Sequence, residues 1–198
     1  MAGQEISKDE SLSLKGYRHA CHVMIYADTE AKLFGKIPIK HIVLMQMRFD
    51  GFLGFPGGIV NPREESLEAG LCRELWEEIG MALKVGPEDH CSSCLALSPP
   101  DLVTHFYTKK LREEEVREVE RAAVSSAADH GLEVMGMIRV PLYCLKKGEG
   151  FPSFLSNSFI DSARSQLLAA LRVLGLLSQE ELEAAVATAK MMRQSTAH

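Results

Sequence analysis

The segment from Gly57 to Gly80 constrains the fold of this chain more than any other part of the sequence. A glycine pair, Gly57-Gly58, precedes a stretch over 66–79 with a regular apolar repeat, and Gly80 follows it. Because an α-helix turns about 100° per residue, one face collects the apolar residues Leu67, Leu71, Leu75 and Ile79. The pattern predicts an amphipathic helix over 66–79 that Gly80 ends.

Three glutamates lie on a neighbouring face of this predicted helix. Glu74, Glu77 and Glu78 have i, i+3, i+4 spacing, and helical geometry places Glu78 inside the edge of the apolar stripe. An ionised carboxylate at a buried position needs a partner, and like charges one turn apart destabilise a helix. Carboxylates that converge on one face suit a hard cation such as Mg²⁺, so the cluster indicates a functional site.

A solvated acidic face is the other explanation of the glutamates, with Arg73 as the counter-ion of Glu77. The spacing taken alone favours that explanation, because glutamates are common on helix surfaces. Glycines, however, let backbone groups approach a metal ion or a phosphate closely. The glycine pair before the helix therefore shifts the balance towards a site.

The rest of the chain mixes strand-like and helical segments. Strands are expected over 19–27, 41–49, 52–55, 102–111 and 132–142, and helices near residue 8 and over 112–128, 158–174 and 178–192. Asp50-Gly51 is a tight-turn dipeptide that joins two of these strands, and Pro56-Gly57-Gly58 is read as a loop. This order predicts an α/β or α+β sandwich with helices outside a mixed sheet.

Composition narrows the class of protein further. The chain has 198 residues, of which 46% are hydrophobic and 25% charged, as in an ordinary single globular domain. Its formal net charge of -5 excludes a domain that binds nucleic acid through a strongly basic surface, so any RNA contact is a local patch or a specific pocket. No apolar run reaches the roughly 18 residues of a membrane span. We expect a soluble, intracellular protein with no membrane partner.

The five cysteines indicate reduced thiols in a reducing compartment, because the count is odd and no signal-peptide core is visible. Cys91 and Cys94 have C-x-x-C spacing. A structural zinc ion normally takes four ligands from two such pairs, and the sequence has no second pair. Two free thiols in a loop are therefore the better interpretation.

The segment over 57–80 resembles the signature of the Nudix hydrolases: Gly, five residues, Glu, seven residues, then Arg-Glu-Leu-x-Glu-Glu-x-Gly. The second half matches fully from Arg73 to Gly80. The first half departs by one residue, because six residues separate Gly58 from Glu65. Either the loop carries a one-residue insertion or Glu64 substitutes for the first glutamate.

Further blocks over 18–22, 44–51, 54–58, 129–134 and 157–160 resemble a Nudix branch of small nucleolar RNA-decapping enzymes and inosine diphosphate phosphatases. The resemblance implies a Nudix α/β/α sandwich with a mixed sheet and C-terminal helices. It also implies three parts: an N-terminal segment over 1–16, a Nudix domain over 17–177, and a C-terminal helix and tail over 178–198.

The resemblance also implies the site residues. The metal ligands would be Glu74, Glu77, Glu78, Glu133 and the Gly57 carbonyl, holding two or more Mg²⁺ or Mn²⁺ ions, with Glu78, Glu133 and Glu74 as the catalytic carboxylates. The nucleotide would be bound by His22, Arg48, Phe55 and Gln166, with Phe55 stacked on the purine. Each of these four residues also has an ordinary explanation: core residues, an ion pair of Arg48 with Asp50, or a solvent-facing Gln166.

Three functions follow as hypotheses from the resemblance. The first is decapping of methylguanosine-capped small nucleolar RNA and mRNA, and the second is hydrolysis of inosine and deoxyinosine diphosphates. The third is a binding module for RNA or protein without turnover, like the pseudoenzyme relative syndesmos, which has lost box glutamates that this chain keeps. A homodimer and a location in the nucleus (nucleolus and nucleoplasm) and cytoplasm are further expectations.

Overall fold

A computed structural model describes residues 3–96 and 101–195 of the chain. The strands are β1 (Gln4–Ile6), β2 (Arg18–Asp28), β3 (Lys32–Leu33), β4 (Ile37–Pro38), β5 (His41–Arg48), β6 (Leu53–Gly54), β7 (Gly57–Val60), β8 (His90–Leu95), β9 (Leu102–Lys110) and β10 (Val134–Arg139). The α-helices are α1 (Lys8–Ser13), α2 (Leu67–Ile79), α3 (Glu113–Ser125), α4 (Phe151–Leu155), α5 (Ala163–Val173) and α6 (Gln179–Ser195). Short 3-10 helices lie at Pro87–Asp89 and Lys146–Gly148.

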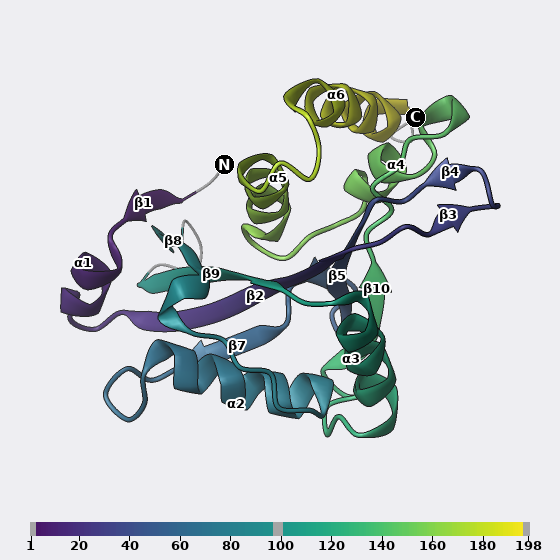
Figure 1. The fold of residues 1–198 in the computed structure, drawn as a ribbon. Coiled ribbons are helices and arrows are strands. Elements are labelled where there is room, and N and C mark those ends of the chain that lie inside the picture. Colours follow the sequence, from purple (N-terminus) through teal and green to yellow (C-terminus); the bar gives the residue numbers. More distant parts are fainter. Residues whose placement is uncertain (1–2, 97–100, 196–198) are drawn as a thin grey trace.

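The molecule has three layers, with the main sheet in the middle (Figure 1). Helices α4, α5 and α6 cover one face, and α2 and α3 cover the other. Strand β2 shows why both faces are apolar, since Met24 joins one core while its neighbours Val23 and Ile25 join the other. The α/β/α sandwich with a mixed sheet and C-terminal helices is therefore confirmed.

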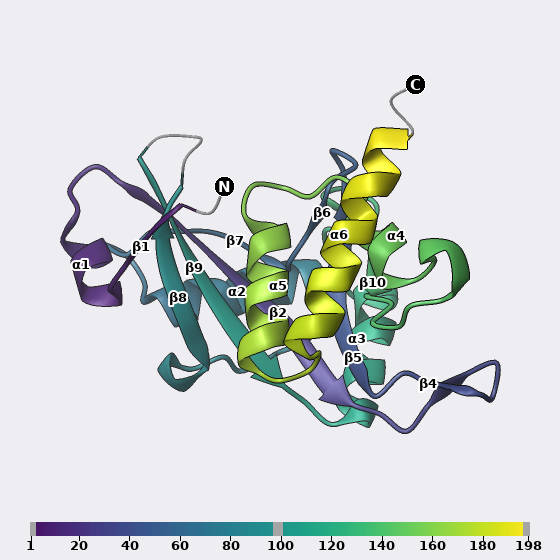
Figure 2. The same ribbon diagram turned by 90° about the horizontal axis from the view of Figure 1, so that it is seen from above.

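Strand β2 organises the sheet, whose main path runs β1-β8-β9-β2-β5-β10. It pairs in parallel with β9 and antiparallel with β5 and β7. The register of β2 with β7 sets His22 opposite Gly57. Figure 2 shows α5 and α6 lying side by side over the sheet, while the β3–β4 hairpin extends away from it. No helix in the described part is long and apolar enough to cross a membrane.

Helix α2 follows the prediction closely. The Ser66 side chain accepts a hydrogen bond from the Ala69 backbone N–H at 3.1 Å, which caps the first turn. Gly80 adopts a left-handed conformation with φ 77° and ends the helix. The four residues of the apolar stripe are buried: Leu67, Leu71, Leu75 and Ile79.

Several boundaries differ from the sequence prediction. Gly57 and Gly58 belong to strand β7 rather than to a loop, because they pair with β2. The helix expected to begin at residue 158 begins at Ala163: Leu53 and residues 158–160 exchange backbone hydrogen bonds, so this segment is extended. Cys91 and Cys94 are free thiols, as predicted, but they lie on β8 and not in a loop.

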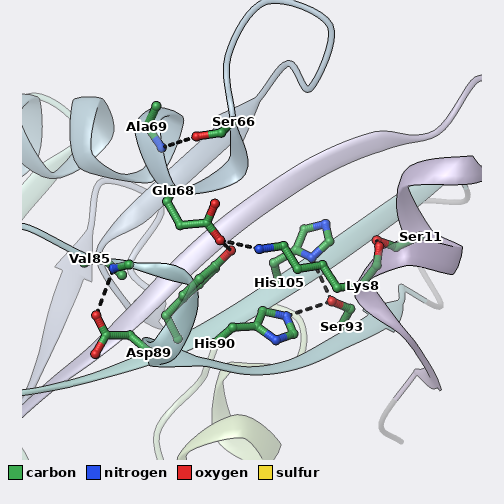
Figure 3. A network of polar contacts seen from close by, with 12 residues as sticks. Lys8, Ser11, Ser66, Glu68, Ala69, Val85, Asp89, His90, Ser93 and His105 are labelled. Atoms are coloured by element: carbon green, nitrogen blue, oxygen red, sulfur yellow. Dashed lines mark hydrogen bonds and ion pairs between the residues drawn. The ribbon is translucent and has the colours of Figure 1, made fainter.

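A largely buried chain of polar side chains joins β8, β9 and β2, and Figure 3 shows its part from His90 through Ser93 to His105. His90 Nε2 lies 2.9 Å from Ser93 Oγ, which lies 2.8 Å from His105 Nδ1. His105 Nε2 in turn lies 2.9 Å from His19 Nδ1. Burial lowers the pKa of all three histidines, to about 3 for His105.

Candidate active site

The sequence-predicted residues converge on one cavity of about 400 Å³ between the glycine strand β7, helix α2 and the start of α5. Its walls include nearly every candidate residue: His22, Arg48, Phe55, Gly57, Glu74, Glu78, Glu133 and Gln166. Glu77 does not line this cavity. Its side chain is 44% exposed and lies 3.7 Å from Arg73, which is the surface ion pair that the alternative explanation expected.

Glu78 is the buried carboxylate that the helical geometry predicted, since only 6% of it is exposed. The Gly57 backbone N–H donates to Glu78 Oε2 at 2.7 Å, and Gln46 Nε2 donates to Oε1 at 2.9 Å. Both partners are neutral. Burial therefore dominates and raises the pKa of Glu78 to about 7.

Glu74 lies one turn earlier and faces Gly58. A Cβ atom at Gly58 would lie 2.2 Å from Glu74 Oε2, so a side chain at this position would displace the Glu74 carboxylate. Arg73 Nη1 donates to Glu74 Oε1 at 2.7 Å. Burial still raises the pKa of Glu74 above its ordinary value, and the charges of Glu77 and Glu133 add to this effect.

The first half of the Nudix signature departs by one residue, which left Glu64 and Glu65 as candidates for its first glutamate. In the structure Glu65 makes the contact with the helix arginine. Its Oε1 atom accepts a hydrogen bond from Arg73 Nη2 at 2.9 Å. The same arginine also holds Glu74, so one guanidinium joins the loop glutamate to the helix glutamate. The structure therefore favours a one-residue insertion in the loop.

Glu133 reaches the cavity from a position that differs from the prediction. Glu133 was expected on a strand, but it lies in the turn just before β10, which begins at Val134. The Phe49 backbone N–H donates to the Glu133 carbonyl at 3.0 Å and holds this turn against the end of β5. Its side chain lines the same cavity as Glu74 and Glu78.

The residues predicted to bind a nucleotide line the same cavity. Burial, helped by the charge of Arg48, lowers the pKa of His22 to about 4, so this imidazole is neutral at pH 7. Arg48 forms the ion pair with Asp50, at 2.9 Å, and also lines the cavity. Phe55 is 3% exposed and packs against Phe106 with ring centroids 5.0 Å apart.

Gln46 contacts the candidate site and was missed by sequence reasoning. It is 1% exposed, and its amide holds Glu78 in place. A lone glutamine inside the apolar strand segment over 41–47 was the available signal, because a buried amide needs hydrogen-bond partners. Asp161 and Ser162 also line the cavity beside Gln166 and were not predicted.

The donor chemistry of the cavity fits a hard divalent cation, because Glu74, Glu78 and Glu133 offer carboxylate oxygens and Glu78 has only neutral partners. In the described part of the chain, however, no three His, Cys, Asp or Glu side chains are gathered closely enough to hold a metal ion as they stand. Glu74 and Glu78 are instead engaged by Arg73, Gly57 and Gln46.

The sandwich fold and a glutamate helix facing a glycine strand define a Nudix hydrolase, a class that generally uses divalent metal ions. A family model described as "Nudt16-like: U8 snoRNA-decapping enzyme-like" matches residues 19–177. The chain belongs to this family.

Two kinds of relative are similar to this chain over most of its length. The U8 snoRNA-decapping enzyme of Xenopus laevis is 53% identical over 184 residues, which cover 91% of this chain and 86% of that protein. The Tudor-interacting repair regulator protein of Homo sapiens is 48% identical over 188 residues, covering 94% of this chain and 88% of that protein.

Among solved structures, the Nudix domain of Shewanella oneidensis NrtR complexed with ADP ribose aligns with 84% of this chain and 100% of that chain. The TM-score of this match is 0.49 and the sequence identity is 16%.

Proposed function

We propose that this protein is a metal-dependent hydrolase of diphosphate linkages that removes methylguanosine caps from small nucleolar RNA and mRNA. We propose that it also hydrolyses inosine and deoxyinosine diphosphates to monophosphates. The observation that carries the proposal is Glu78, a buried carboxylate with neutral partners in the same cavity as Glu74 and Glu133. The U8 snoRNA-decapping relatives support the choice of capped RNA.

The metal ligands we propose are the carboxylates of Glu74, Glu77, Glu78 and Glu133 and the Gly57 carbonyl, with two or more Mg²⁺ or Mn²⁺ ions. Bound ions of this kind activate water and neutralise charge on phosphate oxygens. Glu77 would have to turn away from Arg73 to take part, since it lies outside the cavity wall.

The chain's own groups then have separate tasks in this proposal. Glu78 or Glu133 accepts the proton of the attacking water. Gln46 and the Gly57 N–H orient the Glu78 carboxylate, and Arg73 holds Glu74 against Gly58.

Phe55, His22 and Gln166 bind the purine in this proposal. The neutral His22 ring offers one donor and one acceptor, and the Gln166 amide offers both to a 6-oxo purine edge. Arg48 lines the same cavity and supplies positive charge for the phosphates.

A binding module without turnover is the alternative, and the similarity to the Tudor-interacting repair regulator protein favours it. The retained glutamates and their placement around one cavity favour the hydrolase instead.

A hydrolysis panel separates these functions. Purified protein would be given Mg²⁺ or Mn²⁺ and capped RNA, inosine diphosphate, guanosine diphosphate or ADP-ribose, with product identification. The Glu78→Gln variant should lose nearly all hydrolysis while remaining folded, and Glu118→Gln on the exposed face of α3 should keep it. Full turnover by Glu78→Gln would contradict the site, and absence of turnover by the parent on every substrate would favour the binding module.

For location we propose the nucleus (nucleolus and nucleoplasm) and the cytoplasm, supported by the small nucleolar RNA named in the decapping relatives. We also propose a homodimer, supported by an apolar C-terminal region with exposed residues such as Val173 on α5. Imaging of the tagged full chain and sedimentation at several concentrations test these two proposals.

A further inference from the structure

A second cleft, of about 340 Å³, lies beside the catalytic cavity. It is lined by Phe52, Ser156, Ser158, Phe159, Asp161, Arg164 and Arg193. Asp161 lines this cleft and the catalytic cavity at once, so the two spaces adjoin. We call the second cleft the arginine cleft, because two guanidinium groups from different helices meet there.

The position of Arg164 is unfavourable for the stability of the fold. It lies in the first turn of α5, where the positive end of the helix dipole repels a cation. Its Nε atom is buried and has no hydrogen-bond partner among the residues described. A buried donor without a partner is destabilising. Such a position suits a group whose partner arrives with a ligand.

Arg193 approaches the same cleft from α6. Its Nε atom donates to the Ser156 carbonyl at 3.0 Å, and its Nη2 atom donates to the Leu155 carbonyl at 3.2 Å. These bonds fix the guanidinium above the turn that carries the cleft's serines. Both guanidinium groups line the arginine cleft. Burial lowers the pKa of Arg164, and the charge of Arg193 lowers it further.

The donor chemistry of the arginine cleft favours an anion. Arg164 lines it, and the buried Nε donor of this guanidinium has no hydrogen-bond partner among the described residues. A guanidinium presents its N–H donors in a planar fork that matches phosphate oxygens. Phe52 is 39% exposed at the same cleft and offers a ring face to a base.

We propose that the arginine cleft binds phosphate groups of the RNA chain that follows the cap, with Phe52 stacking on an adjacent base. This inference rests on the proposed decapping activity and adds to it a separate binding subsite for the RNA beyond the cap. A nucleoside diphosphate places all of its phosphates at the glutamates. Only a longer substrate has a phosphate left for a second cleft, so the arginine cleft favours capped RNA over a free diphosphate.

Steady-state kinetics on two substrates tests this proposal. Arg164→Gln should raise KM about tenfold for a capped RNA of ten nucleotides and leave kcat and KM for inosine diphosphate unchanged. Unchanged turnover of the short substrate also shows that the variant is folded. Arg164→Lys, which keeps the charge, should restore part of the loss. Arg172→Gln, at an exposed position of the same helix, is the matched control and should behave like the parent.

A binding measurement keeps the test independent of catalysis. Fluorescence anisotropy with an uncapped 5′-monophosphate RNA in EDTA should give weaker binding for Arg164→Gln. The slope of log affinity against log salt should fall by about 0.7, the value for one phosphate contact on a single strand.

The outcomes separate the two proposals. If Arg164→Gln binds RNA more weakly but the parent turns over no substrate, the proposed function is wrong and the arginine cleft stands. Equal KM values of Arg164→Gln and Arg172→Gln for capped RNA would overturn the proposed role of the arginine cleft and leave the proposed hydrolase activity standing. An equal KM increase on inosine diphosphate would assign Arg164 to the diphosphate site and also overturn the proposal.

Discussion

The raised pKa of Glu78 makes the stability of the metal-free protein depend on pH in a direction that can be stated in advance. In the unfolded chain this carboxyl titrates near 4.5, and in the folded chain near 7. The folded state therefore holds a proton that the unfolded state releases as the pH rises between these values. The stabilisation by neutral Glu78 is fully present below pH 4.5 and is lost once the pH passes about 7.

The size of the effect follows from the two pKa values. At 1.36 kcal/mol for each pH unit, the interval from 4.5 to about 7 corresponds to about 3 kcal/mol. Gln46 Oε1 gives a structural reason for this preference, since it is buried without a hydrogen-bond partner in the part of the chain described. A protonated Glu78 could donate to that oxygen once the Gln46 amide turns over.

Urea unfolding in EDTA at several pH values would measure this effect. The free energy of unfolding of the parent, relative to Glu78→Gln, should fall by about 3 kcal/mol between pH 4.5 and 7.5. The comparison cancels the titration of other groups. Glu118→Gln should instead follow the parent at every pH. A constant difference between the parent and Glu78→Gln would refute the assignment of the raised pKa to this residue.

Three further predictions follow from the site and its surroundings. Gln166→Ala should reduce any preference for inosine over adenosine diphosphate up to about tenfold, measured as a ratio of kcat/KM values; an unchanged ratio would contradict the role of this amide. Gly58→Ala should lower kcat at least about tenfold, because its Cβ displaces Glu74, and normal kcat would show that Glu74 can move freely. Buried His105, whose pKa is lowered to about 3, should make the protein less stable as the pH falls below 6.5, since the unfolded imidazole binds the proton first; His105→Gln should weaken that acid dependence in thermal unfolding.

The elements with strong periodicity could be predicted from the sequence. Helix α2 and the strands β2, β5 and β9 were expected nearly at their observed bounds, because an apolar stripe or a β-branched run signals them directly. Strand β8 has no such signal, since the segment from His90 to Leu95 is mostly small and polar. It forms because β9 and β1 supply hydrogen-bond partners on both sides.

In the candidate site, too, features set by neighbouring residues in the sequence could be predicted, and contacts between distant segments could not. Burial of Glu78 follows from its angle on the helix, which is local. Its partner Gln46 comes from a strand 32 residues away, and no periodicity relates the two. Glu133 came from resemblance alone, and a turn rather than a strand places it. The roles of these residues in catalysis stay predictions.

The N-terminal residues contact helix α2, which carries the glutamates. Their removal would therefore affect the rest of the protein. Glu68, in the first turn of α2, bonds to Lys8 (Figure 3) and also accepts a hydrogen bond from Tyr107. Strand β1 covers the free edge of β8. A chain beginning at Tyr17 would leave the β8 edge open to pairing with another molecule and would strip Glu68 of its ammonium partner. Such a truncated protein should form aggregates at concentrations where the full chain does not, although it keeps every residue of the catalytic cavity.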